Sequence, residues 1–333
     1  MSKRYNGGVV SSDGPQVAMG PALFEFTSFT FLPIVSPGSS TGPTLSQMQS
    51  AYAGQPWLSY LSMGSYQGYQ RWAVPQTRSY TIEAGGAMGG DGLVYYGSNI
   101  GTYAYGAKIQ GNFELISGHV IEIVVGVKGG SSGGAHGNEN GGGGGTFVRN
   151  VTTNTLLLVA GGAGGMPSPS YGTSCTRTVA DGHGQSGNSV AVFTCNSTVS
   201  APTIGYGGNS AGSYQGGAGG GYLGAGQNGG THCATAFGGS GFNTGLVGGS
   251  GNTCYDTRNN GGFGGGGGGQ LGSPGAGGGY TGGNSAGGWS SYSTYGGGGG
   301  SYNIGTSAVN TAGGNTGSLG GSVGAGYCKI TKI

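Results

Sequence analysis

The feature that most constrains this fold is glycine, above all in residues 261–300, which read GGFGGGGGGQLGSPGAGGGYTGGNSAGGWSSYSTYGGGGG. An α-helix is excluded there, because each glycine in a helix interior costs about 1 kcal/mol relative to alanine. Ordinary strands are disfavoured as well, since glycine has no side chain to pack. Two structures remain open: a disordered linker, or extended helices of the polyproline II type, which have about three residues per turn and no internal hydrogen bonds.

The rest of the composition favours the folded alternative. Of 333 residues, 88 are glycine, yet 34% are hydrophobic and only 6% are charged, with a formal net charge of +2. Disordered chains usually stay soluble through charge, which this chain lacks. Between residues 161 and 320 glycine tracts alternate with glycine-poor connectors, and earlier tracts cover 85–92 and 129–145. This alternation of tracts and connectors predicts a bundle of extended glycine helices that hydrogen bond to one another through their main chains.

The remaining chain has the patterns of β-structure. Alternating apolar residues predict strands within 23–35, 70–74 and 80–82. Further strands are expected at 146–150, 155–160 and 322–333. Residues 107–127 predict a hairpin with its turn at Ser117 and Gly118. Residues 45–52 predict a short helix, with Thr44 as its N-cap. Strands at this spacing predict a β-sandwich of the jelly-roll type.

Several motifs carry a resemblance to a known family. In chain order they are GPTLSQMQSAY, YQRWAVPQTRSYTIEAGGAMGG, GAKIQGNFELISGHVIEIVVGVKGG, GGGGGTFVRN, LLLVAGGAGG and GGFGGGGGG. Their order resembles the extracellular glycine-rich domain of the anaplastic lymphoma kinase and leukocyte tyrosine kinase receptors, over about residues 23–333. The resemblance implies a mainly β fold, a tumour-necrosis-factor-like jelly-roll β-sandwich with an inserted bundle of polyglycine II helices. It implies no receptor function, because kinase motifs are absent and the cytokine-contacting residues of the family are not identifiable here.

These features divide the chain into three expected parts. Residues 1–22 form a polar leader, residues 23–160 form the sandwich, closed by a strand from 321–333, and residues 161–320 form the glycine-rich bundle. The leader begins MSKRYNGGVVSSDGPQ and lacks the apolar centre of a secretory signal peptide. It resembles the leaders of structural proteins of marine tailed phages. With no run of eighteen or so apolar residues, the chain predicts no membrane span.

The sequence predicts a protein that is not an enzyme and that holds no cofactor or metal ion. Its nine carboxylates form no closely spaced acid–base pair and are expected on solvated strand faces. The histidines and cysteines lack the HxxxH and CxxC spacings of zinc sites. No glycine run continues into the GK[ST] of a phosphate-binding loop. Eleven scattered basic residues also argue against a nucleic-acid partner.

Four of the five cysteines are candidates for disulfide bonds. Cys175 and Cys195 lie in one glycine-poor insertion, and Cys233 and Cys254 lie in another. Each pair would close a local loop, which contributes about 3 kcal/mol to stability. Four cysteines allow three pairings, and the sequence does not choose among them. Cys328 is left over in the predicted terminal strand, where we expect a buried thiol.

Aromatic residues in the connectors are the candidate recognition surface. The chain has 20 tyrosines, and many lie where glycine tracts turn. Tyrosine and tryptophan offer large, rigid contact areas at a low entropic cost, which suits binding to sugars or protein surfaces. The candidate receptor-binding residues are Tyr95, Tyr96, Tyr103, Tyr105, Trp289, Tyr292 and Tyr295. The alternative is that these rings cap the bundle or wedge against its glycine faces.

The first function predicted is a non-enzymatic virion structural protein of a tailed phage, as a tail fibre, tail-tip adhesin or capsid decoration. Such a protein would lie on the particle surface as a homotrimer. It would attach to other virion proteins through residues 1–22 and contact a host-surface glycan or protein. The leader supports this prediction, and polyglycine II bundles occur in tail-tip adhesins of some phages. Two alternatives stay open: a secreted or surface ligand-binding module of the receptor type, and an extracellular matrix fibre subunit.

Overall fold

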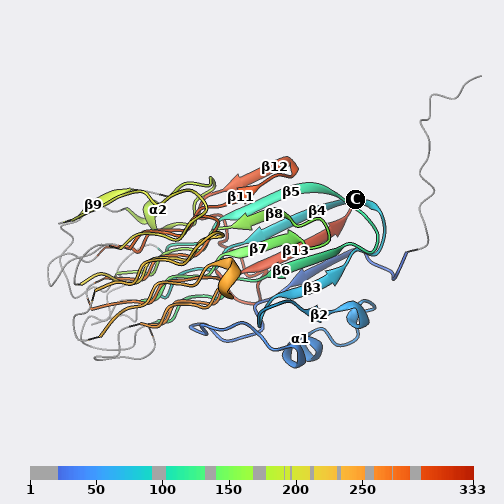
Figure 1. The fold of residues 1–333 in the computed structure, drawn as a ribbon. Helices are drawn as coiled ribbons and strands as arrows, with labels where there is room; N and C mark the ends of the chain where they lie inside the picture. The colour runs from blue at the N-terminus through green and yellow to red at the C-terminus, as the bar shows by residue number, and fades with distance from the viewer. Residues whose placement is uncertain are drawn as a thin grey trace, which may run out of the picture.

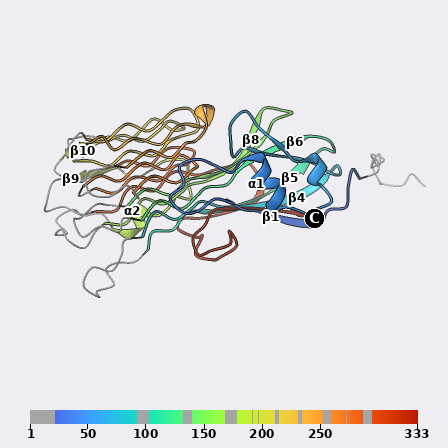
Figure 2. The same ribbon diagram turned by 90° about the horizontal axis from the view of Figure 1, so that it is seen from below.

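The computed structural model describes residues 22–91, 103–131, 140–167, 178–190, 192–195, 197–210, 214–230, 234–251, 259–271, 273–285 and 294–333. Two antiparallel sheets lie toward one end of an elongated molecule, and the glycine-rich segments extend from these sheets toward the other end (Figure 1, Figure 2). Helices are few and short. The fold is therefore mainly β, as the sequence predicts.

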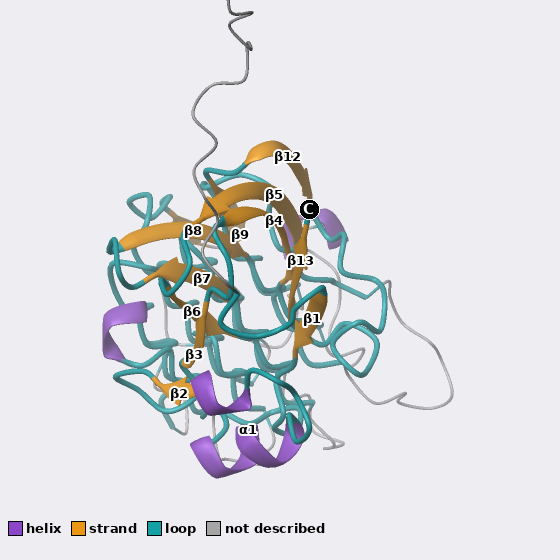
Figure 3. Cartoon of the chain, turned by 90° about the vertical axis from the view of Figure 1, so that its right-hand side faces the viewer, coloured by secondary structure: helices purple, strands orange, loops and turns teal. Residues whose placement is uncertain are grey.

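The two sheets contain most of the strands. The five-stranded sheet has the order β1 (Ser28–Phe31), β13 (Tyr327–Lys332), β4 (Arg78–Gly85), β5 (Lys108–Leu115) and β12 (Thr306–Thr311). The six-stranded sheet has the order β11 (Tyr302–Asn303), β8 (Thr155–Ala160), β7 (Thr146–Asn150), β6 (Val120–Val124), β3 (Gln70–Ala73) and β2 (Ser62–Met63). Figure 3 shows them from the strand ends as two neighbouring layers, with β1, β13, β4 and β5 in one layer and β3, β6, β7 and β8 in the other.

The predicted short helix is confirmed as α1, Leu45–Ala51. The Gln47 N–H donates to the Thr44 hydroxyl at 3.3 Å, and the Thr44 N–H donates to the Gln47 side-chain oxygen at 2.8 Å. This capping box satisfies N–H groups that the first turn of a helix leaves without partners. The remaining short elements are α2 (Val179–Gly182), the 3-10 turns Leu58–Tyr60 and Phe242–Thr244, and the strand pair β9 (Phe193–Cys195) and β10 (Ser197–Val199).

The main hydrophobic core lies between the two sheets. Strand β4 contributes Tyr80 and Ile82 from one sheet, and Trp72 and Ile121 come from β3 and β6 of the other; all four are fully buried. Side chains that alternate along each strand reach this space from both inner faces. Each such side chain contributes about 1.5–3 kcal/mol through its burial.

The six-stranded sheet is covered on its other face as well. Val124, Phe147 and Val159 belong to a second buried cluster, together with Phe242 and Phe263 of the glycine-rich part. Strands β6, β7 and β8 therefore have two buried faces. This explains why β8 is continuously apolar from Leu156 to Ala160 rather than alternating.

Residues 107–127 do not form the predicted hairpin. Both strands exist, but β5 pairs with β4 and β12, whereas β6 pairs with β3 and β7. The turn at Ser117 and Gly118 carries the chain from one sheet to the other. Phe113 of β5 and Ile121 of β6 thus contribute to the same core from opposite sides.

Among the described carboxylates, Glu122 departs from the expected solvated strand faces. Glu122 of β6 is only 2% exposed, and it accepts hydrogen bonds from Arg71 Nε at 2.9 Å and from Arg149 Nη2 at 2.8 Å. The guanidinium of Arg149 also lies 5.1 Å from the centre of the Phe242 ring. Because the Phe242 turn covers this face of the sheet, the carboxylate is removed from water and depends on both cations.

The glycine-rich segments bond to one another through their main chains with a period of three residues. Within residues 141–145, the first three N–H groups donate to three different neighbouring segments, at 2.7–2.9 Å. The fourth N–H group donates to the same segment as the first, and the fifth to the same segment as the second. The donor–acceptor pairs are Gly141–Gly130, Gly142–Gly267, Gly143–Ala163, Gly144–Val127 and Gly145–Gly264. Residues 162–166 repeat the pattern with the pairs Gly162–Gly278, Ala163–Ala87, Gly164–Gly182, Gly165–Gly275 and Met166–Gly90.

The neighbouring segments approach so closely that only glycine fits. A Cβ atom added to Gly142 would lie 1.9 Å from the carbonyl oxygen of Ala276, and one added to Gly144 would lie 1.8 Å from that of Phe263. A main-chain oxygen cannot move aside as the end of a flexible side chain can. The glycine at these positions is therefore required by packing between segments.

Both the sheets and the glycine-rich part contain segments from before and after residue 160. Tracts within 86–90, 126–130 and 140–145 hydrogen bond to later tracts. Conversely, β11 and β12, from residues 302–311, pair with strands of the two sheets. Several strand ends continue directly into glycine segments, which ties the two parts together.

Candidate binding surface at helix α2

Of the seven aromatic residues predicted to form a recognition surface, three are described by the structure. They are Tyr103, Tyr105 and Tyr295. The other four, which lie outside the described residues, are Tyr95, Tyr96, Trp289 and Tyr292. The three described residues come from two distant parts of the chain, and both parts meet at helix α2.

Helix α2 is a single turn fixed in place by local and distant hydrogen bonds. The Thr178 N–H donates to the Asp181 carboxylate at 2.8 Å as part of a capping box. The carbonyl of Gly182 accepts the Gly164 N–H, and the carbonyl of Asp181 accepts the Gly298 N–H. Two glycine tracts therefore hold the turn in a defined position among the glycine-rich segments (Figure 1).

The rings of Tyr103 and Tyr105 lie beside the end of this turn. Their centres are 6.2 Å apart, and the Tyr105 ring stacks on His183 at 6.3 Å with the planes 23° apart. The Tyr105 N–H donates to His183 Nδ1 at 2.9 Å. Nδ1 therefore acts as the acceptor, which places the proton of the neutral ring on Nε2. Burial lowers the pKa of His183, which favours this neutral form.

Tyr295 approaches the same turn from a different glycine tract. A Cβ atom added to Gly182 would lie 3.0 Å from Tyr295 Cβ and 3.2 Å from Ala104 Cβ. Burial raises the pKa of Tyr295, whereas Tyr103 is 42% exposed. The surface thus combines an exposed ring with two partly buried rings on a main-chain scaffold.

Sequence reasoning missed His183 as a member of this surface. No spacing or neighbouring motif distinguishes it from the other histidines. Its position depends on residues that are distant in the sequence. The Tyr105 N–H donates to its ring, and Gly313 packs so closely that an added Cβ atom there would lie 2.5 Å from the imidazole. Contacts of this kind leave no local pattern in the sequence.

The predicted disulfide positions lie largely outside the described residues. Cys175, Cys233 and Cys254 are not described, and for Cys195 only the backbone in β9 is described. Cys328 of β13 is a buried free thiol, as expected, and burial raises its pKa. Within the described ranges, no group of three or more His, Cys, Asp or Glu residues is placed to hold a metal ion. The helices of the same ranges lack the length and apolar character that crossing a membrane requires.

Comparison with known proteins shows a partial similarity to a receptor kinase. No protein-family model matches the chain. A stretch of 90 residues, which is 27% of the chain, is 36% identical to the leukocyte tyrosine kinase receptor of Mus musculus. The matched stretch spans 10% of that receptor. The similarity is to the family that the motifs resemble, but it covers far less than residues 23–333.

Proposed function

We propose that this chain is a non-enzymatic display module, in which a rigid β-structure presents an aromatic recognition surface to a host-surface glycan or protein. The surface is centred on α2 and His183. Its described contact residues are Tyr103, Tyr105 and Tyr295. Tyr95, Tyr96, Trp289 and Tyr292 stay proposed receptor-binding residues outside the described part of the chain.

The proposal includes a specific architecture for the scaffold. The two sheets form a jelly-roll sandwich of the tumour-necrosis-factor-like type, and the glycine tracts form a bundle of polyglycine II helices. The three-residue period of the hydrogen bonds supports these helices, because a polyproline II-type helix has about three residues per turn and turns successive N–H groups to three sides. A segment bonded on several sides is stiff, which suits display.

The observation that carries the proposal is the assembly of aromatic side chains from two distant segments on one hydrogen-bonded turn. Tyr105 is held by His183, and Tyr295 lies against Gly182. Because both are held by other residues before any ligand arrives, binding loses little side-chain entropy. Tyrosine rings of this kind are frequent anchors at recognition surfaces.

The setting that we propose is the surface of a tailed-phage particle, with residues 1–22 attached to other virion proteins and the chain present as a homotrimer. The resemblance of the leader to phage structural proteins supports this setting. A receptor-type ligand-binding module is the second candidate, supported by the 36% identity with the leukocyte tyrosine kinase receptor over 90 residues. Mass spectrometry of purified phage particles separates the two, since peptides of this chain occur in the particles only in the first setting.

We expect Tyr103→Ala to weaken ligand binding about tenfold or more, because loss of a central tyrosine typically costs more than about 1.4 kcal/mol. The matched control is Tyr206→Ala, since Tyr206 is 48% exposed and Tyr103 is 42% exposed. Binding of the labelled full chain to a glycan array and to fixed bacterial cells is the measurement, with the melting temperature recorded for each variant.

The expected result is loss of binding for Tyr103→Ala alone, with melting temperatures unchanged. Equal binding by both variants would argue against the surface at α2. A melting temperature that falls together with binding would instead support the alternative that the ring stabilises the bundle.

A further inference from the structure

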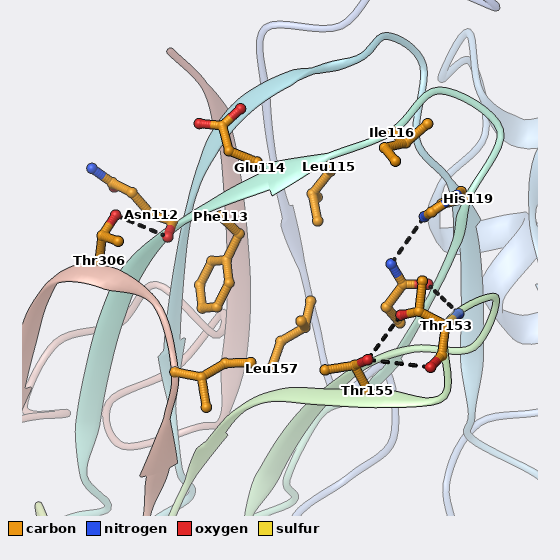
Figure 4. Close-up of a pocket in the computed structure, with 12 residues that line it drawn as sticks. Asn112, Phe113, Glu114, Leu115, Ile116, His119, Thr153, Thr155, Leu157 and Thr306 are labelled. Atoms are coloured by element: carbon orange, nitrogen blue, oxygen red, sulfur yellow. Dashed lines mark hydrogen bonds between the residues drawn. The ribbon is translucent and has the colours of Figure 1, made fainter.

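A pocket of about 380 Å³ opens at the edge of the sandwich, between β5 and β8 (Figure 4). Its lining comes from the end of β5, the β5–β6 connection, the β7–β8 turn and the crossing from β11 to β12. Strands β4, β6 and β8 run into glycine segments at their opposite ends. The pocket is therefore distant from the glycine tracts and independent of the surface proposed at α2.

One wall of the pocket is apolar, whereas His119, Asn150, Thr153 and Thr155 line the side toward the β7–β8 turn (Figure 4). Phe113 and Leu115 extend from β5 toward Leu157 of β8, and all three are buried (Figure 4). At the mouth, Ile116 is 53% exposed and Ile304 is 48% exposed. Exposed aliphatic side chains beside an apolar wall favour an apolar ligand group.

Beside this pocket, strand β5 has a stretch of edge that pairs with no other strand of the described residues. Strand β12 pairs with β5 from Lys108 only as far as Asn112, whose carbonyl accepts the Thr306 hydroxyl at 3.4 Å. Main-chain groups of a strand point to the same edge at every second residue, so the N–H and C=O of Glu114 face this edge beyond the last β12 pair. An extended peptide can bond to such an edge as an additional strand.

The side chain of Glu114 gives the rim a negative charge. It is exposed, and it takes part in none of the four ion pairs formed by the described residues. Figure 4 shows it on the opposite side of β5 from Phe113. Successive side chains of an extended peptide also point to opposite sides. A peptide residue that enters the pocket would therefore have a neighbour on the side of Glu114.

We propose that this pocket binds an extended peptide segment of a partner protein that carries a bulky apolar residue next to a lysine or arginine. The apolar side chain enters between Phe113 and Leu157, the main chain bonds to the free edge of β5, and the cation pairs with Glu114.

A displayed library of random heptapeptides, selected on the full chain, tests this site. We expect the enriched peptides to share a bulky apolar residue adjacent to Lys or Arg. Ile304→Lys places a charge at the pocket mouth and should weaken their binding at least tenfold. The control Val309→Lys makes the same change at a position of β12 that is 54% exposed and does not line the pocket. Glu114→Gln should weaken binding about two- to fivefold, the effect of one exposed ion pair.

The site is refuted if no peptides are enriched, if their consensus is acidic, or if the two lysine variants bind them equally. Melting temperatures of the variants show whether weaker binding reflects unfolding. Should Ile304→Lys fail to fold, Ile116→Lys provides a second charge at the mouth, with the same expected loss of binding.

Discussion

Replacement of Gly142 by alanine should destabilise the chain by about 3 kcal/mol or more, the upper range for overpacking. The added Cβ atom would lie 1.9 Å from the carbonyl oxygen of Ala276. Gly142 also donates its N–H to Gly267 and accepts the N–H of Gly262. Relief of the clash must move one segment away from another, which lengthens these hydrogen bonds. The free energy of unfolding from urea titration is the measurement.

Gly187→Ala is the matched control for this substitution. A Cβ atom at Gly187 would meet nothing within 4 Å, and its backbone conformation is open to any residue. Alanine there should be neutral or should stabilise the chain by about 0.4–1 kcal/mol, because it restricts the unfolded state. Equal stability of the two alanine variants would mean that the tracts are not packed as described.

Glu122→Gln should lower the free energy of unfolding by about 3 kcal/mol, because removal of one member of a buried ion pair leaves its partner without compensation. The carboxylate is 2% exposed and pairs with Arg71 and Arg149, whose side chains are 26% and 19% exposed. Glutamine has nearly the same shape but no charge. Both guanidinium groups would then stay partly buried side by side without their shared anion.

Glu114→Gln is the control for the charge change itself, and it should alter stability by less than about 0.5 kcal/mol, as for most surface substitutions. The double variant Glu122→Gln, Arg149→Met should recover part of the loss, since it removes one unpaired cation. If Glu122→Gln proves no less stable than Glu114→Gln, the ion cluster does not stabilise the sheet.

Elements that depend on local patterns could be predicted from the sequence. The strands at 146–150 and 155–160 appear as β7 and β8, which pair with each other through a short polar turn. The cap at Thr44 also follows from residues within one helical turn. These features require only periodicity and neighbouring side chains, which the sequence displays directly.

The pairing of β5 with β4, rather than with β6, could not be predicted in this way. Alternation shows that each strand has an apolar face, but it does not show which sheet the strand joins. The environment of Glu122 has the same origin, because its partner Arg149 packs against Phe242 from a distant part of the chain. The contact between Tyr295 and α2 likewise depends on glycine tracts whose partners no local pattern identifies.

The central claim is that hydrogen bonds between segments order the glycine tracts. Amide hydrogen exchange on the full chain tests it most directly. We predict that the N–H groups of Gly142, Gly162 and Gly277, which donate to Gly267, Gly278 and Gly297, exchange at least about 1,000-fold more slowly than in an unstructured peptide. Exchange at the unstructured rate throughout these tracts would contradict the account.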